Sequence, residues 1–521
     1  MERLTKTKIY DILRKRFQEG FLKLSSLPSP DSLKDVEKAA KRVAKAIKNR
    51  EKIAVVGDYD VDGVVSTAIM KEFFSYINYP VTIKIPNRFK DGYGITKELV
   101  KNIDAEVIIT VDNGISAVEA AEYCLERGID LIITDHHTPP ENLPNAYAII
   151  NPKQSMCSFK YEEICGAQVA WFFIAQLKKE LRLNLDMKIF LDLLSIAIIA
   201  DVMPLRHINR VLVQAGLKYF EISERPAIKF LRKTLKKSSF NSEDIGFTIA
   251  PVLNSAGRMD SAVLALDFLT SKDFFESSIL YGRLLALNSE RKSEEKRVFN
   301  EAKLHEKESS KIIVAAGDDW HEGVVGIVAS RLVDRFKKPA IILTKTGEFY
   351  KGSGRSFANI DLYSLLDKNR YLLHRFGGHK KAAGLSLAKT NLPGLIDGLN
   401  KEIESVPKED WIEGTNVLGE LPFEEVDWEL IDIIDKFAPY GESNPMPKFA
   451  ALNVEVADFR EVGENGEHLL MTLRQKNRVF KAIKFRNSVK LNKDSIDIVY
   501  YPQKNIFNNN IYIQLNILKI S

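Results

Sequence analysis

The stretch IAVVGDYDVDG (Ile53–Gly63) is the strongest indication of this chain's architecture. It joins a short apolar run to three aspartates, Asp58, Asp60 and Asp62. A run this short and this rich in Ile and Val is typical of a strand buried on both faces of a parallel sheet. We therefore expect the aspartates at the carboxyl edge of that strand, where open α/β sheets bind their ligands.

Two later runs repeat this arrangement. EVIITV ends before Asp112, and LIIT ends before Asp135-His136-His137. Carboxylates that converge in one crevice repel one another, and bound cations remove that cost. Aspartate oxygens with one or two histidine nitrogens suit Mn²⁺ or Mg²⁺ better than a metal that prefers thiolates. The three clusters together predict a hydrolytic site with two metal ions.

Composition narrows the class of protein. A chain of 521 residues is too long for one ordinary core, and 45% hydrophobic with 28% charged residues is typical of a soluble globular protein. The net charge is only +5, so any nucleic-acid surface must come from local clustering of cations. The three cysteines include no CxxC pair, which argues against structural zinc and favours the cytoplasm. The most apolar run, Leu193–Ala200, is shorter than the roughly 20 residues that span a bilayer, so we expect a buried helix and no membrane association.

The order of the predicted elements indicates several domains. From residue 51, strand-like runs alternate with helical segments, as in βαβ units on a parallel sheet. We expect an α/β protein in which a parallel-sheet domain and a second, smaller α/β domain are joined by a long helix, followed by a small β-barrel. The predicted units are residues 1–50 (helical lead-in), 51–215 (first domain), 216–310 (connector with a long helix near 271–310), 311–400 (second domain) and 410–521 (barrel).

Some of the acidic residues and histidines are better metal candidates than others. Asp60, Asp62, Asp112 and His136 all follow strand-like runs and should point into one crevice. Asp201 follows an apolar run, where a bare carboxylate would be costly to bury, so it is either a further ligand or a helix-end cap.

The two adjacent histidines should point in different directions. We expect His136 to be a ligand and His137 to orient a neighbouring group or meet substrate. The expected chemistry is metal-assisted attack of water on phosphorus, with Asp112 shared between the ions. Asp112, His136 and His137 are the catalytic candidates, and the chain lacks a Ser-His-Asp or Cys-His pattern for a covalent route.

These motifs resemble those of a known family, the DHH phosphoesterases. GDYDVDG, VDNG, TDHH and ADVMPL follow that family's successive motifs. PVLNSAGRM (Pro251–Met259), GSGRS (Gly352–Ser356) and GGHKKAAG (Gly377–Gly384) are similar to the later motifs of its RecJ branch, and the final β region fits that branch's oligonucleotide-binding (OB) domain. The match runs in order from about residue 50 to residue 390.

The resemblance implies a function and a set of site residues. It implies degradation of single-stranded DNA from the 5′ end, in repair and recombination, with two Mn²⁺ or Mg²⁺ ions. The implied metal ligands are Asp58, Asp60, Asp62, Asp112, His136 and Asp201. The implied contacts to the 5′ phosphate or strand backbone are Arg88, Arg258, Ser353 and Arg355, with His379 at the same cleft between domains.

The chain departs from the family pattern at one position. Many DHH proteins have a histidine four residues before the middle aspartate of the first motif, and here that residue is Val56. This puts the coordination of one metal in question, and we expect Asp58 to complete that ligand set.

Two further patterns indicate anion binding. The glycines of GSGRS would let backbone N–H groups approach an anion, so we expect GSGRS and GGHKKAAG to be loops that face the metals. Residues 474–493 hold eight Lys or Arg and no acid, which favours a single-strand groove lined by Lys481, Lys484 and Arg486. The alternative for this stretch is a solvated strand pair, and we expect its two phenylalanines, Phe480 and Phe485, to lie in the barrel core.

Three functions are compatible with these patterns. The leading hypothesis is a metal-dependent 5′→3′ exonuclease that releases mononucleotides from single-stranded DNA. The first alternative is a DHH phosphodiesterase for short oligonucleotides, cyclic dinucleotides or polyphosphate, although such chains usually lack the terminal β domain. The second is a catalytically silent scaffold that binds DNA. The expected partners are single-stranded DNA and possible loading proteins, namely a helicase or a single-strand-binding protein, and nothing in the sequence demands more than a monomer.

Overall fold

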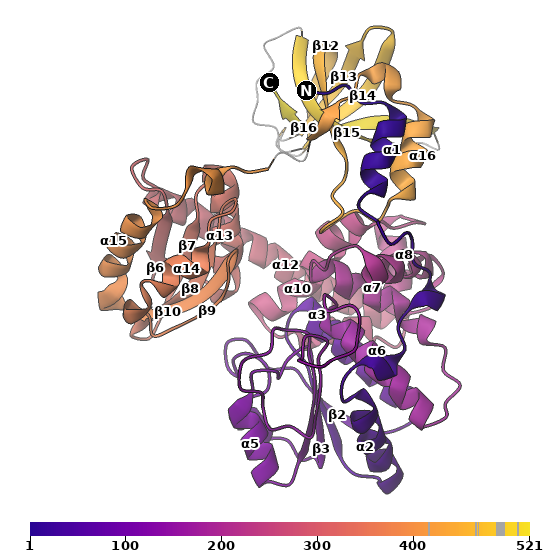
Figure 1. The fold of residues 1–521 in the computed structure, drawn as a ribbon, viewed down its shortest axis with the longest axis vertical. Coiled ribbons are helices and arrows are strands. Elements are labelled where there is room, and N and C mark those ends of the chain that lie inside the picture. Colours follow the sequence, from indigo (N-terminus) through magenta and orange to yellow (C-terminus); the bar gives the residue numbers. More distant parts are fainter. Residues whose placement is uncertain (415–416, 464–465, 467, 486–494, 508–509) are drawn as a thin grey trace.

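The computed structural model describes residues 1–414, 417–463, 466, 468–485, 495–507 and 510–521. It contains three sheets, each with its own hydrophobic core (Figure 1). The first α/β domain and the barrel form one column, and the second α/β domain lies beside it at the end of a long helix (Figure 1). The expected fold class is therefore confirmed.

The first domain is built on a parallel five-stranded sheet with the order β2-β1-β3-β4-β5. Strands β1, β3 and β4 contain the apolar runs that precede the acidic clusters. They are fully or almost fully buried, because helices cover both faces of the sheet. Alternate side chains of β1 point to opposite cores: Val55 packs toward α2, α3 and α6, and Val56 packs toward α4 and α5. The strands are β1 (Ile53–Val56), β2 (Val81–Lys84), β3 (Val107–Val111), β4 (Asp130–Thr134) and β5 (Ala148–Ile150).

Helices make up the rest of this domain and its connector. The apolar run expected to be a buried helix is α7, and it packs against α3 and α8. The helices are α2 (Val36–Asn49), α3 (Val61–Tyr76), α4 (Lys97–Lys101), α5 (Val118–Glu126), α6 (Gly166–Glu180), α7 (Leu191–Ala200), α8 (His207–Ile222), α9 (Pro226–Leu235), a π-helix η4 (Asp244–Ile249), α10 (Ala250–Met259) and α11 (Val263–Leu269).

A single long helix joins the two α/β domains. It is α12 (Phe274–Ala302), with 29 residues and a length of about 44 Å at 1.5 Å per residue. Its first half contributes Tyr281 and Leu284 to the core of the first domain, and its second half contributes Val298 and Phe299 to the core of the second. One rigid element therefore sets the spacing of the two domains.

Buried charges fix the angle between α12 and the first helix of the second domain. Glu295 on α12 accepts hydrogen bonds from Arg291 (2.6 Å) and from Arg331 on α13 (2.9 Å). Arg291 also donates to Asn288 one turn earlier. The carboxylate thus bridges two cations on two helices, so removing it would leave a buried positive charge without a partner.

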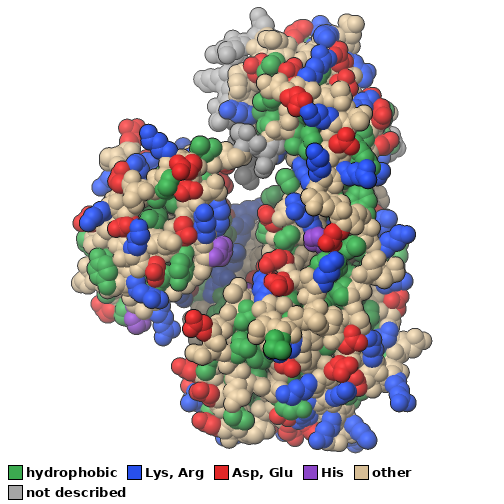
Figure 2. Space-filling view, in the orientation of Figure 1, with side chains coloured by type: hydrophobic (Ala, Val, Ile, Leu, Met, Phe, Trp, Pro, Cys, Tyr) green, Lys and Arg blue, Asp and Glu red, His purple; other side chains and the backbone are tan. Residues whose placement is uncertain are grey.

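The second domain has a mixed sheet with the order β6-β7-β8-β10-β9, in which only β6 and β7 are parallel. Figure 2 shows a deep hollow between this domain and the column, with lysine and arginine side chains at its back. The elements are β6 (Ile313–Gly317), α13 (Glu322–Phe336), β7 (Ala340–Thr346), β8 (Phe349–Arg355), α14 (Leu362–Asp367), β9 (Arg375–His379), β10 (Ala382–Ala388) and α15 (Leu392–Ile403).

The third sheet closes on itself because β12 pairs with both β13 and β15. Its strands are mainly antiparallel, with parallel pairing only at β11–β12 and β14–β16 among the described strands. The elements are β11 (Val417–Glu420), α16 (Trp428–Lys436), β12 (Lys448–Val462), β13 (His468–Gln475), β14 (Arg478–Lys484), β15 (Ser495–Phe507) and β16 (Asn510–Ile520).

Residues 1–50, which the sequence suggests as one lead-in, contribute to two different cores. The first helix, α1 (Lys6–Arg14), packs against α16, and Leu4, Ile9 and Leu13 are buried in the barrel core (Figure 1). Helix α2 instead covers the parallel sheet of the first domain. Within the described part of the chain, none of the helices has both the length and the apolar character that crossing a bilayer requires.

The segment that leads into the barrel is bonded to the helices of the first domain. Arg210 on α8 donates to the carbonyls of Lys436 and Ala438, and Ser242 donates to the carbonyl of Tyr440. The Arg210 guanidinium also lies 4.2 Å from the ring centroid of Phe21. These contacts fix the barrel above the first domain.

Candidate metal centre

The first acidic motif lies where β1 ends and α3 begins. Asp58 is buried, and its Oδ1 accepts a hydrogen bond from the backbone N–H of Tyr59 at 2.8 Å. Asp60 is the N-cap of α3, and its side chain accepts from the backbone N–H of Gly63 at 3.0 Å. A short polar residue at this position satisfies an N–H that the helix leaves unpaired.

Asp62 lies against the N-terminus of α6. Its two oxygens accept hydrogen bonds from the backbone N–H groups of Gly166 (2.6 Å) and Ala167 (2.9 Å). The absence of a side chain at Gly166 is required here, because a Cβ atom would lie 2.4 Å from Oδ1 of Asp112. Gly166 therefore lets carboxylates from two different strand ends approach each other.

Asp112 follows β3 with a backbone φ of +63°, a conformation that residues other than glycine rarely adopt. The next residue, Asn113, holds this turn in place. Its amide donates to the carbonyls of Val56 (3.1 Å) and Val111 (2.9 Å), and its oxygen accepts from the N–H of Ile95 (3.0 Å). Strain that neighbouring contacts maintain in this way is common at functional sites.

His136 follows β4 and faces the carboxylates. Its Nε2 atom lies 3.2 Å from Oδ1 of Asp112, 3.6 Å from Oδ2 of Asp201 and 3.8 Å from Oδ2 of Asp62. Ligands at roughly 2.1 Å from an octahedral ion are about 3 Å apart when adjacent, so these spacings suit a shared ion. All six proposed metal ligands thus meet at the carboxyl edge of the parallel sheet.

Several buried polar atoms of this cluster have no hydrogen-bond partner in the described part of the chain. They are Oδ1 of Asp112, Nδ1 of His136 and Oδ2 of Asp201. Potential ligand atoms within 4.8 Å of one another form three groups, and Asp112 belongs to two of them. Buried oxygens without donors are what a cation site requires, and the donor set of carboxylates and one imidazole fits Mn²⁺ or Mg²⁺. The three groups are Asp58/Asp60/Asp112, Asp62/His136/Asp201 and Asp112/His136/His137.

The electrostatics of the cluster lead to the same conclusion. Burial, and then the neighbouring carboxylates, raise the pKa of Asp112 well above its ordinary value. The same causes raise the pKa of Asp58, and they raise the pKa of Asp201 to about 9. Cations among these side chains would offset both the desolvation and the repulsion, and would keep the carboxylates ionised.

The sequence did not assign a role to Asp135, and the structure gives it one. This buried carboxylate accepts hydrogen bonds from the N–H groups of Ile115, His136 and His137, and from Nδ1 of His137 at 2.8 Å. Burial alone would raise the pKa of Asp135, but these bonds hold it below its ordinary value. Asp135 therefore anchors the backbone of both histidines and the half-exposed ring of His137.

Val56, at the position of the family's usual histidine, is fully buried in the core on the α4–α5 face of the sheet. Its side chain is apolar and packs there with Ile108 and Ile133. It contributes no ligand, and the donors of the cluster come from the neighbouring strand ends and from Asp201 at the end of α7.

The proposed phosphate-binding side chains gather where α10 meets the N-terminus of α13. Arg258 donates to the carbonyl of Gly323 at 3.2 Å, and Arg355 donates to Oγ of Ser353 at 2.5 Å. Arg88 stacks over the ring of Tyr59 at 4.3 Å. Burial, followed by the charges of Arg88, Arg291 and Arg355, lowers the pKa of Arg258 to about 10. Like charges gathered near a helix N-terminus favour a bound anion.

The prediction that GSGRS is a loop was wrong. Gly352, Ser353, Gly354 and Arg355 belong to β8, which pairs with β7 on one side and β10 on the other. A Cβ atom at Gly352 would lie 1.9 Å from the carbonyl oxygen of Ile342, so close packing of strands explains this glycine. Any anion would contact the side chains of Ser353 and Arg355 rather than a glycine-rich backbone.

GGHKKAAG is likewise not a separate loop but the hairpin of β9 and β10. His379 is exposed and pairs with Ala382, which in turn pairs with Arg355. His379 and Arg355 thus lie two strands apart at the same end of the sheet, about 10 Å from each other.

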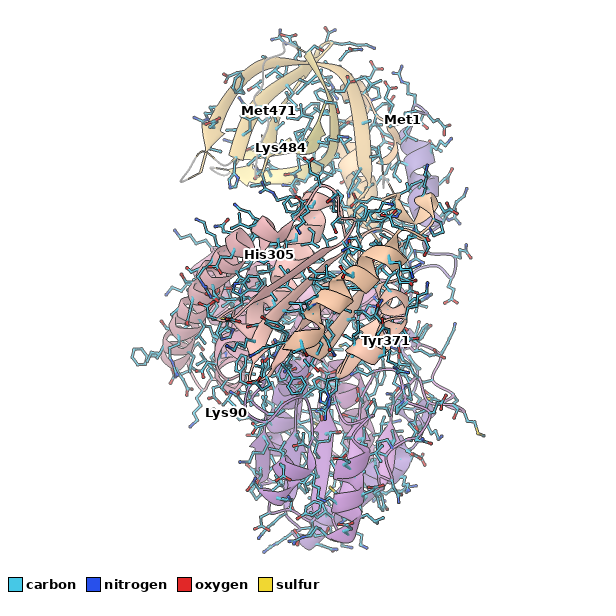
Figure 3. All side chains as sticks on the ribbon, turned by 90° about the vertical axis from the view of Figure 1, so that its left-hand side faces the viewer. Met1, Lys90, His305, Tyr371, Met471 and Lys484 are labelled. Carbon is cyan, nitrogen blue, oxygen red and sulfur yellow. The ribbon has the colours of Figure 1, made fainter. Side chains whose placement is uncertain are left out.

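The basic stretch of the barrel lies partly on β14. Lys481 donates to Thr472, and Lys484 donates to the carbonyl of Leu518. Lys484 lies at the end of the barrel that faces the two α/β domains (Figure 3). The third predicted cation, Arg486, is outside the described residues.

The two phenylalanines of this stretch behave differently. Phe480 packs against the barrel core, with its ring centroid 5.3 Å from that of Phe423, as predicted. Phe485 is 57% exposed and packs edge-on against His468, so its assignment to the core was wrong.

Comparison with known families divides the chain in the same way as its sheets. Residues 52–198 match the DHH family N-terminal domain, residues 309–405 match the DHHA1 domain, and residues 419–519 match the RecJ OB domain.

Individual relatives match over most of the chain. The single-stranded-DNA-specific exonuclease RecJ of Bacillus subtilis is 37% identical over 88% of this chain, which spans 59% of that protein's length. The protein of the same name from Haemophilus influenzae is 31% identical over 94% of this chain and 91% of its own. The crystal structure of Thermus thermophilus RecJ in complex with Mn²⁺ covers all of this chain and 79% of that one, with a TM-score of 0.84 and 27% identity. A RecJ structure bound to manganese covers 72% of this chain and 96% of that one, at 31% identity and a TM-score of 0.64. On these matches, the chain belongs to the RecJ family of DHH proteins.

Proposed function

We propose that this protein is a metal-dependent exonuclease that removes mononucleotides from the 5′ end of single-stranded DNA. One observation carries the proposal: buried carboxylate and imidazole atoms without partners among the described residues belong to the same cluster as Asp58 and Asp60, whose charges interact with Arg88 and Arg258 near the N-terminus of α13. The first group suits cations and the second suits a terminal phosphate. The names of the relatives add support for single-stranded DNA as substrate.

In this proposal, two sets of side chains would each hold one metal ion. Asp62, His136 and Asp201 would hold one ion, and Asp58, Asp60 and Asp112 would hold the other. Bound divalent ions at such a site lower the pKa of water and neutralise charge on phosphoryl oxygens. Asp112, which belongs to two of the potential ligand groups, would hold the two ions at a fixed separation.

His137 would act at the open side of the site. Asp135 fixes its Nδ1, and Nε2 lies 3.5 Å from the hydroxyl of Tyr93. In that orientation Nε2 could donate a hydrogen bond to a phosphoryl oxygen or hold a proton for the leaving group.

The polarity of cleavage would come from the junction between α10 and the second domain. Arg258, Ser353 and Arg355 would hold the 5′ phosphate, and α12 sets the distance between this anchor and the carboxylates. A strand anchored by its end presents a fixed bond to the metals, which accounts for release of mononucleotides. Selectivity for single strands follows if the hollow between the domains is too narrow for a duplex; equal rates on blunt duplex and single strands would contradict this.

The test uses purified protein with Mn²⁺ and oligonucleotides labelled at the 5′ or the 3′ end. We expect the 5′ label to appear at once as a mononucleotide and the 3′ label to shorten gradually. Asp112→Ala and His136→Ala should abolish hydrolysis, whereas Asp104→Ala, which removes an exposed carboxylate far from the site, should not. Cleavage of dinucleotides alone would favour the short-oligonucleotide alternative, and binding without hydrolysis would favour a scaffold.

The cellular setting belongs to the same proposal. The three cysteines are free, which supports a reducing compartment such as the cytoplasm. A role in DNA repair and recombination, and loading by a helicase or a single-strand-binding protein, are proposed on the family resemblance.

A further inference from the structure

A cavity of about 780 Å³ opens directly beside the candidate metal centre, on the side toward the barrel. Residues on both sides of Asp201 line it, together with η4, α10, α12 and the loop over residues 440–446. Asn254, which also lines it, accepts a hydrogen bond from the N–H of Val61 within the first acidic motif. The cavity is therefore continuous with the site described above, yet none of the proposed metal ligands lines it.

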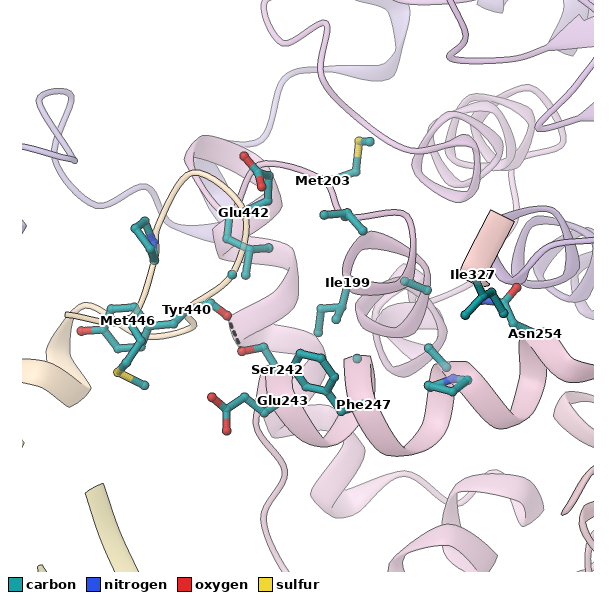
Figure 4. Close-up of a pocket in the computed structure, with 18 of the residues that line it drawn as sticks. Ile199, Met203, Ser242, Glu243, Phe247, Asn254, Ile327, Tyr440, Glu442 and Met446 are labelled. Atoms are coloured by element: carbon teal, nitrogen blue, oxygen red, sulfur yellow. Dashed lines mark hydrogen bonds between the residues drawn. The ribbon is translucent and has the colours of Figure 1, made fainter. Parts of the chain in front are cut away.

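An exposed aromatic ring stands in this cavity. Phe247 lies on the π-helix η4, and 83% of its surface is exposed. Figure 4 shows it beside Ile199, between the loop that carries Tyr440 and the helix that carries Asn254. A π-type helix is rare and is often found at functional sites. A ring held in solvent in this way has its faces free to contact another planar group.

A second exposed apolar side chain lies on the same cavity. Val202 directly follows Asp201, is 62% exposed and has a backbone φ of +54°. A β-branched residue in this left-handed conformation is an outlier, because its Cβ atom crowds the backbone. The structure thus keeps a strained, solvent-exposed apolar residue next to a metal ligand, although Gly or Asn would fit the backbone without strain.

The charged residues of the cavity suit a polyanion at one side. Lys292 on α12 is exposed and has no ion-pair partner in the described part of the chain, and Arg258 lines the same wall. Three acids also line the cavity: Glu295 is already paired with Arg291 and Arg331, and Glu243 and Glu442 lie near the barrel-side loop (Figure 4). The combination of an aromatic face, an apolar neighbour and a free cation matches the needs of an unpaired nucleotide better than those of an apolar ligand.

We propose that this cavity receives one unpaired nucleotide close to the scissile bond, with its base stacked on Phe247 against Val202 and its phosphate near Lys292. This inference rests on the proposed function. It adds a positioning role: a base held here fixes the strand beside the metals, and only a base free of a complementary strand presents its faces to the ring.

The test measures binding of 3′-labelled single-stranded oligonucleotides by fluorescence anisotropy in EDTA, so that no hydrolysis occurs. Phe247→Ala should weaken binding by about 5- to 150-fold, the range expected for one base on one aromatic ring. Phe247→Trp should restore affinity. Phe275→Ala, which removes a 75% exposed phenylalanine from α12 that does not line the cavity, is the matched control and should bind like wild type.

A scan of the DNA identifies the stacked base. A single abasic site is moved along the oligonucleotide one nucleotide at a time. At one position it should weaken binding to wild type as much as Phe247→Ala does, and there it should add little further loss in Phe247→Ala. Equal abasic penalties in the two proteins at every position, or wild-type affinity of Phe247→Ala, would overturn the inference.

The two proposals fail in different ways. Wild type that binds the strand but does not hydrolyse it with Mn²⁺ refutes the exonuclease function, while the abasic scan still decides whether Phe247 stacks on a base. Wild type that hydrolyses the strand without coupling between Phe247 and any abasic position refutes only the role of the cavity. Wild type that neither binds nor hydrolyses single strands refutes both.

Discussion

Replacing Gly166 by alanine should damage the metal centre without unfolding the protein. The added Cβ atom would lie 2.4 Å from Oδ1 and 2.5 Å from Cβ of Asp112, whereas ordinary contacts begin at 3.4 Å. The Asp112 side chain must therefore move away by about 1 Å. Overpacking of this kind costs about 1–3 kcal/mol of stability, and a 1 Å misplacement at a reacting centre can cost about 10²-fold in rate.

Calorimetric titration with Mn²⁺ and steady-state rates on single-stranded DNA measure the two effects. We expect Gly166→Ala to bind Mn²⁺ at least ten-fold more weakly and to lose about 10²-fold in kcat/KM, with cooperative thermal unfolding retained. The matched control is Gly282→Ala in the middle of α12, where the added Cβ meets nothing within 4 Å. This control should gain about 0.5–1 kcal/mol of stability and keep full activity. Wild-type Mn²⁺ affinity and rate in Gly166→Ala would refute the argument that this glycine makes room for a ligand.

Three further predictions concern the metals and the DNA path. Mn²⁺ at about 100 times its dissociation constant should raise the free energy of unfolding of the wild-type protein by about 2.7 kcal/mol, measured by scanning calorimetry. The increase should be much smaller in Asp112→Ala. An equal increase in this variant would place the ions elsewhere. Arg355→Ala should weaken binding of a 5′-phosphorylated oligonucleotide by about ten- to 100-fold, because a charged hydrogen bond is lost. Its Mn²⁺ affinity should be unchanged. Equal affinity of the wild-type protein for phosphorylated and hydroxyl 5′ ends would contradict a phosphate anchor. Neutralising Lys481, Lys484 and Arg486 together should reduce the slope of log affinity against log salt by up to about 2, and an unchanged slope would put the DNA path away from this face of the barrel.

The parts of the fold that the sequence predicted correctly are those with a strong local signal. β1, β3 and β4 are covered on both faces, so almost every position is Ile, Val, Leu, Ala or Thr, and the carboxylates follow directly. The same reasoning brings Asp58, Asp112 and His136 together, because parallel strands end at one edge.

The errors came from residues whose local signal has two possible causes. Glycines mark both flexible loops and closely packed strands, and in GSGRS the second cause applies, since Gly352 lies against the carbonyl of Ile342. The exposed Phe485 has the sequence context of a barrel residue, and only the register of β14 shows where the strand ends. Asp135 was visible beside two histidines, but its four hydrogen bonds depend on a turn that cannot be read from composition.

The packing of α1 against distant parts of the chain also could not be predicted from the sequence. The apolar face of α1 is evident from the sequence, yet its partners, α16 and the barrel, lie more than 400 residues later in the chain. No local pattern could assign Leu4, Ile9 and Leu13 to that core rather than to the parallel sheet that follows them.

This arrangement has a consequence during synthesis. Ile9 and Leu13 are synthesised about 500 residues before Leu515 and Ile517, which belong to the barrel strands that cover them. Translation proceeds at about 5–20 residues per second, so the apolar face of α1 stays exposed for roughly 25 to 100 seconds. Throughout that interval the nascent chain exposes the apolar face of α1, so a chaperone that shields it should raise the yield of active protein more than one that acts on the finished chain.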